Sequence, residues 1–372
     1  MNDPKRMSNN VSDAPPAASN DALNDLTLRL SRYRATDVAP VPGWSRGVPL
    51  DYLADLIEYW RSEYDWRVHE ARIRSLPWTT AGREHPLRLI HQTADPAAPT
   101  VLFLHGWPDS ILRFERILPK LANVNVVMPA LPGYPFALPV PEGGLSIGDM
   151  ASPISDAMSD LGYERYIVSA GDVGCDVAEV LAAENPAQVA ALHLTDVSQL
   201  HYLVDPPADL SDAEKEYVRH GQHWQATEGA YSHEQATKPQ TLAVGLGDSP
   251  AGLAAWILEK LHGWTDCDGD VESVFSRDEL LTWISAYWFD GSIGTSFSPY
   301  AGGAVKSWPR LVTPTAFTIF PKDLVNAPKE FADRFFNVKS WQEFDRGGHF
   351  AAWERPDDYL SGVRAATALA AG

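Results

Sequence analysis

One short stretch, Tyr166-Ile-Val-Ser-Ala-Gly-Asp-Val-Gly-Cys175, constrains the fold of this chain more than any other. The β-branched pair Ile167 and Val168 predicts a buried strand, small residues follow at once, and a helical pattern begins at Asp176. Strand, tight turn and helix in this order are typical of a nucleophile elbow, which raises the side chain at its tip above the edge of a sheet. The residue at that tip is Asp172.

The chemistry of Asp172 suits this position. A carboxylate is ionised near neutral pH, so it can act as a nucleophile without a base to deprotonate it first. The stretch alone leaves a second interpretation equally open, in which Asp172 only caps the helix that follows. Residues further along the chain favour the first interpretation.

Strands and helices alternate around this turn, and the alternation predicts a mostly parallel sheet with helices on both faces. Residues 87–91 and 101–104 are expected to form a pair of strands. The other expected strands are at residues 124–127, 166–168, 191–194, 315–320 and 338–344. The expected helices are at residues 110–121, 147–161, 176–185 and 356–369.

The chain divides into four expected parts. Residues 1–20 are rich in Asn, Ser, Pro, Asp and Ala and are predicted to be a disordered tail. Residues 21–85 carry amphipathic helical patterns, and residues 86–199 and 306–372 form the predicted α/β core. Residues 200–305 are helical and rich in tryptophan, so we expect a lid inserted into the core.

Composition excludes several classes of partner. The net charge of −19 argues against binding to nucleic acid or to an anionic membrane surface. The only two cysteines, Cys175 and Cys267, give no disulfide framework and fit a reducing compartment. No apolar run reaches transmembrane length, and the first residues lack the apolar core of a signal peptide. We therefore expect a cytoplasmic protein.

Three further segments carry chemistry near the ends of expected strands. His105-Gly follows one strand, and the backbone N–H groups there, with that of Val173, are suited to hold an oxyanion. Asp323 follows a late strand, and His349 follows two glycines after the last strand. Asp323 or His349 alone is more often a solvated loop residue, and His105-Gly alone could be an ordinary turn at the end of a strand. Together they give the order nucleophile, acid, histidine, which is the chain order of α/β-hydrolases.

Two other motifs are rejected. Gly144-Leu-Ser-Ile-Gly148 matches the G-x-S-x-G pattern, but no strand precedes it, and Ser146 is better interpreted as a helix N-cap. Asp266-Cys-Asp-Gly-Asp270 is similar to a calcium loop, yet Gly269 comes too early and the glutamate is missing. The sequence therefore predicts neither a metal nor a cofactor.

From about Ala22 to its end, the chain resembles an epoxide hydrolase of the microsomal type. The resemblance rests on motifs in the N-terminal segment, the core and the lid. They are Gly43-Trp44, Tyr59-Trp60, Tyr64-Asp-Trp-Arg67, Glu70, His105-Gly-Trp-Pro108, Leu131-Pro-Gly-Tyr134, Gly171-Asp172, Gln235-Ala-Thr-Lys-Pro-Gln-Thr241, Asp248-Ser-Pro-Ala-Gly-Leu253 and Gly347-Gly-His-Phe-Ala-Ala352. The resemblance implies an α/β-hydrolase fold wrapped by the N-terminal segment.

It also implies a two-step reaction. In such enzymes two lid tyrosines, here Tyr231 and Tyr300, donate hydrogen bonds to the epoxide oxygen while the aspartate attacks a ring carbon. The resulting ester on Asp172 is hydrolysed by water that His349 activates, with Asp323 orienting the histidine. The backbone N–H groups of Trp107 and Val173 would hold the oxyanion, and the product would be a vicinal diol.

The chain departs from the family at Val173, where a tryptophan is usual, and at Asp109 and Pro135, where glycine is usual. These changes bear on substrate fit more than on chemistry. A haloalkane dehalogenase shares the aspartate nucleophile, but commonly binds halide through a tryptophan beside it. A catalytically silent ligand-binding homologue is the other alternative. The expected partner is a bulky, apolar epoxide, and a homodimer is left open.

Overall fold

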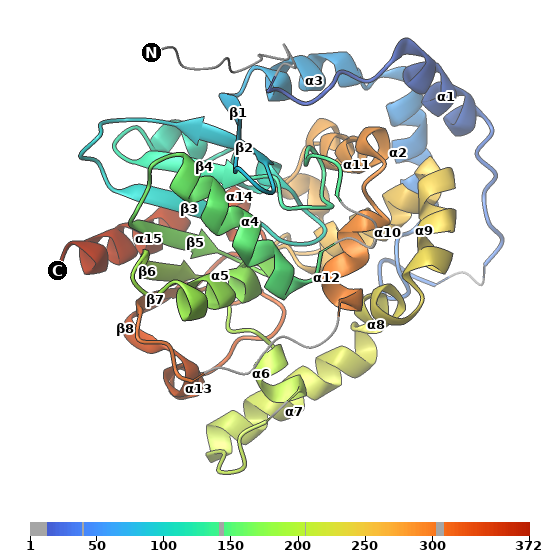
Figure 1. Cartoon of the computed structure of the whole chain (residues 1–372). Helices are drawn as coiled ribbons and strands as arrows, with labels where there is room; N and C mark the ends of the chain where they lie inside the picture. The colour runs from blue at the N-terminus through green and yellow to red at the C-terminus, as the bar shows by residue number, and fades with distance from the viewer. Residues whose placement is uncertain (1–12, 39–40, 141–144, 205, 303–308) are drawn as a thin grey trace, which may run out of the picture.

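The computed structural model describes residues 13–38, 41–140, 145–204, 206–302 and 309–372 (Figure 1). In these ranges one sheet has the strand order β1-β2-β4-β3-β5-β6-β7-β8. Its strands are β1 (Trp78–Ala81), β2 (Leu87–Gln92), β3 (Thr100–Leu104), β4 (Asn125–Pro129), β5 (Tyr166–Ala170), β6 (Val189–Leu194), β7 (Pro314–Ile319) and β8 (Asn337–Glu343).

The sheet is parallel from β4 to β8, and only β1 and β2 join antiparallel. The carboxyl ends of β3, β5, β6, β7 and β8 therefore meet at one edge. The expected pairing of β2 with β3 is wrong, because β4 lies between them and bonds to both. A buried central strand such as β3 takes parallel partners on each side, here β4 and β5, rather than its neighbour in sequence.

Helices cover both faces of this sheet (Figure 1). The helices α4 (Ile147–Asp160) and α5 (Val173–Glu184) pack on one face, and α15 (Pro356–Ala371) packs on the other. The sequence pattern did not predict β1 or α13 (Lys329–Phe335). Every residue of β3 and β5 is buried, as expected for strands in the centre of a doubly covered sheet.

The helix expected at residues 110–121 does not form. Two short 3₁₀ helices, η1 (Ile111–Phe114) and η2 (Leu118–Lys120), take its place. Pro119 lies in the last turn of the expected helix, where it has no N–H to donate and its ring clashes with the preceding turn. The apolar spacing was therefore helical, but the backbone could not continue as an α-helix.

The N-terminal segment contains α1 (Asn20–Ser31), α2 (Leu50–Ser62) and α3 (Trp66–Arg74). The first two pack against α10 (Pro250–Gly263) of the lid. The predicted tail does not extend over residues 13–19. There, Ala18 donates its N–H to Glu70 at 2.6 Å, and Arg74 donates to the carbonyl of Pro15 at 3.0 Å. Residues 1–12 of that tail lie outside the described residues.

The segment between β6 and β7 is helical wherever it has regular structure in the described ranges. Its elements are α6 (Leu200–Leu203), α7 (Asp212–Thr227), α8 (Ala230–Thr237), α9 (Pro239–Asp248), α10 (Pro250–Gly263), η3 (Val271–Ser273), α11 (Arg277–Asp290), η4 (Thr295–Phe297) and α12 (Ser298–Ala301). The boundary expected between residues 305 and 306 lies outside the described residues. α8 and α12 pack against each other beside the sheet edge (Figure 1).

In the described part of the chain, no single helix is both long and apolar enough to cross a bilayer. α9 and α10 reach the length and composition only when taken together, and they meet at a bend of 114°.

Candidate active site

Asp172 occupies the turn between β5 and α5 with a left-handed backbone, φ 57° and ψ −136°. Its neighbours must be small because other atoms approach closely. A Cβ on Gly174 would lie 2.5 Å from the Leu104 carbonyl oxygen, and one on Gly106 would lie 2.2 Å from Asp172 Oδ1. The strained turn expected from the sequence is therefore present, with Asp172 at its tip.

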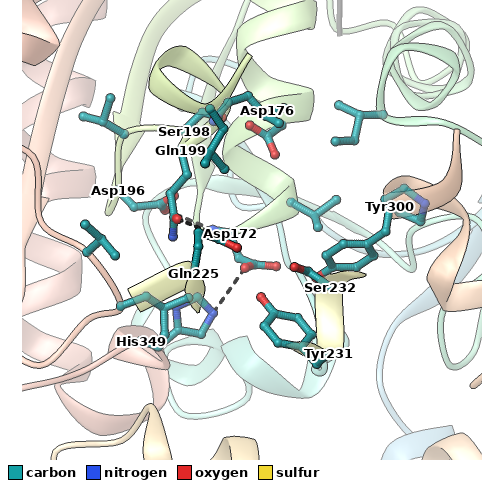
Figure 2. A pocket seen from close by; sticks show the side chains of 18 of the residues that line it. Asp172, Asp176, Asp196, Ser198, Gln199, Gln225, Tyr231, Ser232, Tyr300 and His349 are labelled. Atoms are coloured by element: carbon teal, nitrogen blue, oxygen red, sulfur yellow. Dashed lines mark hydrogen bonds and ion pairs between the residues drawn. The ribbon is translucent and has the colours of Figure 1, made fainter. Parts of the chain in front are cut away.

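The two carboxylate oxygens of Asp172 have different surroundings. Oδ1 accepts a hydrogen bond from the Trp107 N–H at 2.7 Å, and the Val173 N–H also bonds to the carboxyl. Oδ2 lies 3.5 Å from His349 Nε2 (Figure 2). Burial raises the pKa of the Asp172 carboxyl, while His349 and the two N–H groups oppose that rise. Oδ1 is thus held by a backbone donor, and Oδ2 faces His349.

His349 is held through its other ring nitrogen. Its Nδ1 lies 2.8 Å from Asp323 Oδ1, which also accepts the Leu324 N–H at 2.7 Å. Burial lowers the pKa of His349, but Asp323 and Asp172 outweigh burial and bring it above the ordinary value. The sheet edge therefore brings Asp172, Asp323 and His349 together from the ends of β5, β7 and β8.

A buried ion pair joins the two loops that flank Asp172. Arg113 donates to Asp109 Oδ2 at 2.6 Å and also to the carbonyl oxygen of His349. Asp109 Oδ1 accepts the N–H of Gly106, the residue before Trp107, at 2.9 Å. Arg113 and Asp109 are each 1% exposed. The pair therefore connects the loop that carries Gly106 and Trp107, called the oxyanion loop below, to the loop that carries His349, called the histidine loop. Nothing in the sequence around Arg113 indicated this role.

The histidine loop is also held by Glu354. Its carboxylate accepts the N–H groups of Gly348, Phe350 and Asp266, each at 2.9 Å. Burial raises the pKa of Glu354 to about 7 despite these donors. The residue follows the Gly-Gly-His motif by only a few positions, yet the motif itself gave no reason to single it out.

Asp196 was also missed, although a signal for it was present. It follows β6 at the same sheet edge, as Asp323 follows β7. Its Oδ1 accepts the Asp172 backbone N–H and the Cys175 thiol, each at 3.0 Å. Burial, and then the charge of Asp323, raise the pKa of Asp196 to about 6. Asp196 therefore supports the backbone of the strained turn.

The lid places Tyr231 on α8 and Tyr300 on α12, with both hydroxyls pointing toward Asp172 (Figure 2). Their ring centroids are 6.0 Å apart. The ring of Trp107 stacks on Tyr231 at 5.1 Å and meets Tyr300 edge-on at 6.1 Å. Burial raises the pKa of both phenols well above the ordinary value, so both keep their protons and can donate them.

These side chains line a cavity of about 430 Å³. One part of its lining is apolar and another part is polar, and the polar part was not expected from the sequence (Figure 2). The apolar lining includes Ile147, Val173, Val197, Leu200, Leu203, Pro299, Leu324 and Val325, and the polar lining includes Asp176, Asp196, Ser198, Gln199 and Gln225. The cavity thus suits a small molecule with an apolar body.

The rejected motifs have other roles. Ser146 caps α4, and its hydroxyl accepts the Asp149 N–H at 3.2 Å. Asp266 bonds to Arg346 and to the Gly347 N–H, which ties it to the histidine loop. Across the residues that the structure describes, no cluster of three histidine, cysteine or acidic side chains is arranged to hold a metal ion.

Comparison with known families agrees with this architecture. Residues 12–114 match the family "Epoxide hydrolase N terminus", and residues 99–356 match the family "alpha/beta hydrolase fold". A putative epoxide hydrolase of Stigmatella aurantiaca is 36% identical over 91% of this chain and 81% of its own length. Epoxide hydrolase 1 of Oryctolagus cuniculus is 30% identical over 91% of this chain and 84% of its own length.

Solved structures give the same result. Aspergillus niger epoxide hydrolase superposes with a TM-score of 0.81 at 28% identity, covering 96% of this chain and 97% of that one. Juvenile hormone epoxide hydrolase from the silkworm Bombyx mori superposes with a TM-score of 0.82 at 25% identity, covering 95% and 94%. With the N-terminal segment, the fold and relatives of 30% identity or more in agreement, this chain belongs to the epoxide hydrolase family of α/β-hydrolases.

Proposed function

We propose that this protein adds water to an epoxide through a covalent ester on Asp172 and releases a vicinal diol. One observation carries the proposal: the Trp107 N–H holds one oxygen of the carboxylate, the other oxygen faces His349, and two tyrosine hydroxyls are directed at the carboxylate. A nucleophile, a base and donors for a leaving oxygen therefore surround a single cavity. No cofactor enters the reaction.

In the first step Oδ2 of Asp172 attacks a ring carbon. The bond from that carbon to the epoxide oxygen breaks, and its electron pair stays on the oxygen. Tyr231 and Tyr300 donate hydrogen bonds to this developing alkoxide, and one of them supplies its proton. The product of the step is a hydroxyalkyl ester on Asp172.

In the second step His349 Nε2 takes a proton from water, and the hydroxide attacks the carboxyl carbon of the ester. Negative charge develops on Oδ1, which the Trp107 N–H already binds, and the Val173 N–H, which also bonds to the carboxyl, adds a second donor. The tetrahedral intermediate expels the diol oxygen, which takes the proton of the newly added hydroxyl, so Asp172 returns as a carboxylate. The proton on His349 returns to the tyrosinate left by the first step. Asp323 stabilises the imidazolium between these events.

The cavity also supports a substrate class. Apolar side chains around the attacking oxygen suit a bulky, apolar body next to the oxirane. The haloalkane dehalogenase alternative is less well supported, since Val173 offers no side-chain donor to a halide beside the nucleophile. Two phenols suit the oxygen of an epoxide better.

The origin of the diol oxygen tests the mechanism. Enzyme in excess over styrene oxide is allowed one turnover in heavy-oxygen water. The diol should be essentially unlabelled and the peptide containing Asp172 should carry the label, because water attacks the carboxyl carbon rather than the substrate. In H349Q the ester should accumulate as an adduct of the substrate's mass. A fully labelled diol with an unlabelled peptide would mean direct attack by water and would overturn the mechanism.

A further inference from the structure

Lys260 on α10 is buried, with only 4% of its surface exposed, which is unusual for lysine. Its ammonium pairs with Glu259 Oε1 at 2.8 Å, and the Glu259 side chain is one-third exposed. A buried ammonium loses its hydration, so further contacts must replace it. Aromatic rings provide those contacts here.

The ammonium lies over three rings. It is 4.9 Å from the ring centroid of Tyr231, 5.6 Å from that of Trp256 and 5.9 Å from that of Trp264. All three distances are within the range of a cation–π interaction. Two of these rings also belong to the candidate active site. Tyr231 faces Asp172, and Trp264 contacts the His349 ring at 5.2 Å.

Lys260 lies outside the cavity that contains Asp172. It lines a separate cavity of about 540 Å³, together with Trp256, Glu259 and other lid residues. Tyr231 lines both cavities. The ammonium therefore does not line the cavity beside Asp172, and Tyr231 is the nearest of its ring partners.

We propose that Lys260 is a positioning residue that makes Tyr231 a stronger acid during ring opening. The inference rests on the function proposed above, in which Tyr231 donates to the alkoxide. As the hydroxyl gives up its proton, negative charge spreads into the phenol ring under the ammonium. The attraction is then stronger than for the neutral phenol, so it favours the transition state over the ground state. Glu259 opposes this effect weakly because water screens its carboxylate.

The proposal predicts a change in one step only. In stopped-flow measurements of tryptophan fluorescence with styrene oxide, K260M should slow formation of the ester roughly fivefold to thirtyfold, the range of a desolvated cation–π contact. Hydrolysis of the ester should keep its rate. K260R should restore most of the loss. K215M, which removes an exposed lysine from α7, is the matched control and should match the wild type.

A double-mutant cycle separates this role from a general structural one. In the Y231F background, K260M should cause no further loss, because no phenol proton remains to be made more acidic. Wild-type rates in K260M, equal slowing of both steps, or full additivity with Y231F would each overturn the proposal. If K260M does not fold, E259Q tests the same idea, since removing the opposing charge should leave ester formation at least as fast as in the wild type. Slower ester formation in E259Q would contradict the proposal.

These outcomes are distinct from failure of the proposed function. If the wild-type protein forms no diol and no ester, the function itself is wrong. If the wild type turns over and only the Lys260 results disagree, the function stands and the role of Lys260 falls.

Discussion

The Nε2 atom of His349 lies 3.5 Å from Oδ2 of Asp172, and it makes no hydrogen bond within the described part of the chain. The other ring nitrogen, Nδ1, is held by Asp323 at 2.8 Å. Nε2 is therefore the nitrogen that can take a proton near the carboxyl carbon of Asp172. In the mechanism proposed above, this relationship suits the histidine to act as the base for ester hydrolysis rather than as an activator of the carboxylate, which needs no deprotonation.

The first prediction concerns the lid tyrosines. Each phenol should give the developing alkoxide a charge-assisted hydrogen bond of about 1.5–3 kcal/mol. Y231F or Y300F alone should therefore slow ester formation by about tenfold to a hundredfold, and the double variant should nearly abolish it. Stopped-flow kinetics on several epoxides measures this rate. Y163F, which removes a hydroxyl bonded to His91 away from the cavity, should have no effect. Wild-type rates in both single variants would refute the assignment.

The second prediction concerns pH. His349 must be neutral to act as a base, and its pKa is raised above the ordinary value of about 6.5. Ester hydrolysis should therefore fall as pH decreases through the pKa that His349 has in the ester, where Asp323 still raises that pKa but the esterified Asp172 carries no charge. Single-turnover rates of ester breakdown between pH 5 and 9 give the midpoint. A rate that is flat from pH 5 to 8 would exclude His349 as the base of that step.

The third prediction separates the two roles of Asp196, as an acceptor and as a charge. D196N keeps an oxygen for the Asp172 N–H, whereas D196A leaves that N–H without a partner. D196A should therefore lower the free energy of unfolding by about 1–3 kcal/mol, and D196N by clearly less. Denaturant unfolding of both variants measures the difference. Equal losses would show that the hydrogen bond to the turn contributes little.

The charge of Asp196 has its own consequence. The carboxyl titrates at a pKa of about 6, so its ionisation overlaps that of the histidine. The pH profile of the ester-hydrolysis rate in D196N should lose the component near pH 6 and keep the component due to His349. An unchanged profile would mean that Asp196 does not contribute to it.

The fourth prediction concerns the buried pair of Arg113 and Asp109. R113M leaves the Asp109 carboxylate buried without its partner, so we expect a loss of about 3–5 kcal/mol in the free energy of unfolding. The double variant R113M/D109N removes both charges and should lose less than R113M alone. Denaturant unfolding tests this order of stability. A double variant less stable than R113M would show that the unpaired charge of Asp109 is not the cause of the stability loss in R113M.

The sequence alone determined the core of the site, because its signals are local. Small residues must flank Asp172 in a strained turn, and a β-branched strand must precede it. Asp323 and His349 could be placed beside it since the carboxyl ends of parallel strands share an edge. The same local reasoning failed at residues 110–121, where apolar spacing indicated an α-helix but two short 3₁₀ helices form, the second of them containing Pro119. The two tyrosines came only from family resemblance, since a helical lid gives no local sign of which residue faces the nucleophile.

Only the tertiary structure decided which distant residues support that core. Arg113 joins the oxyanion loop to the histidine loop across 236 positions of the chain. Lys260 on α10 lies over the ring of Tyr231 on α8, and Asp196 reaches the turn from the end of the neighbouring strand. Propensity and periodicity determine how a segment folds and which face it buries. They carry no information about which distant segment will pack on that face. The contacts across the sheet edge and the lid depend on which segment that is.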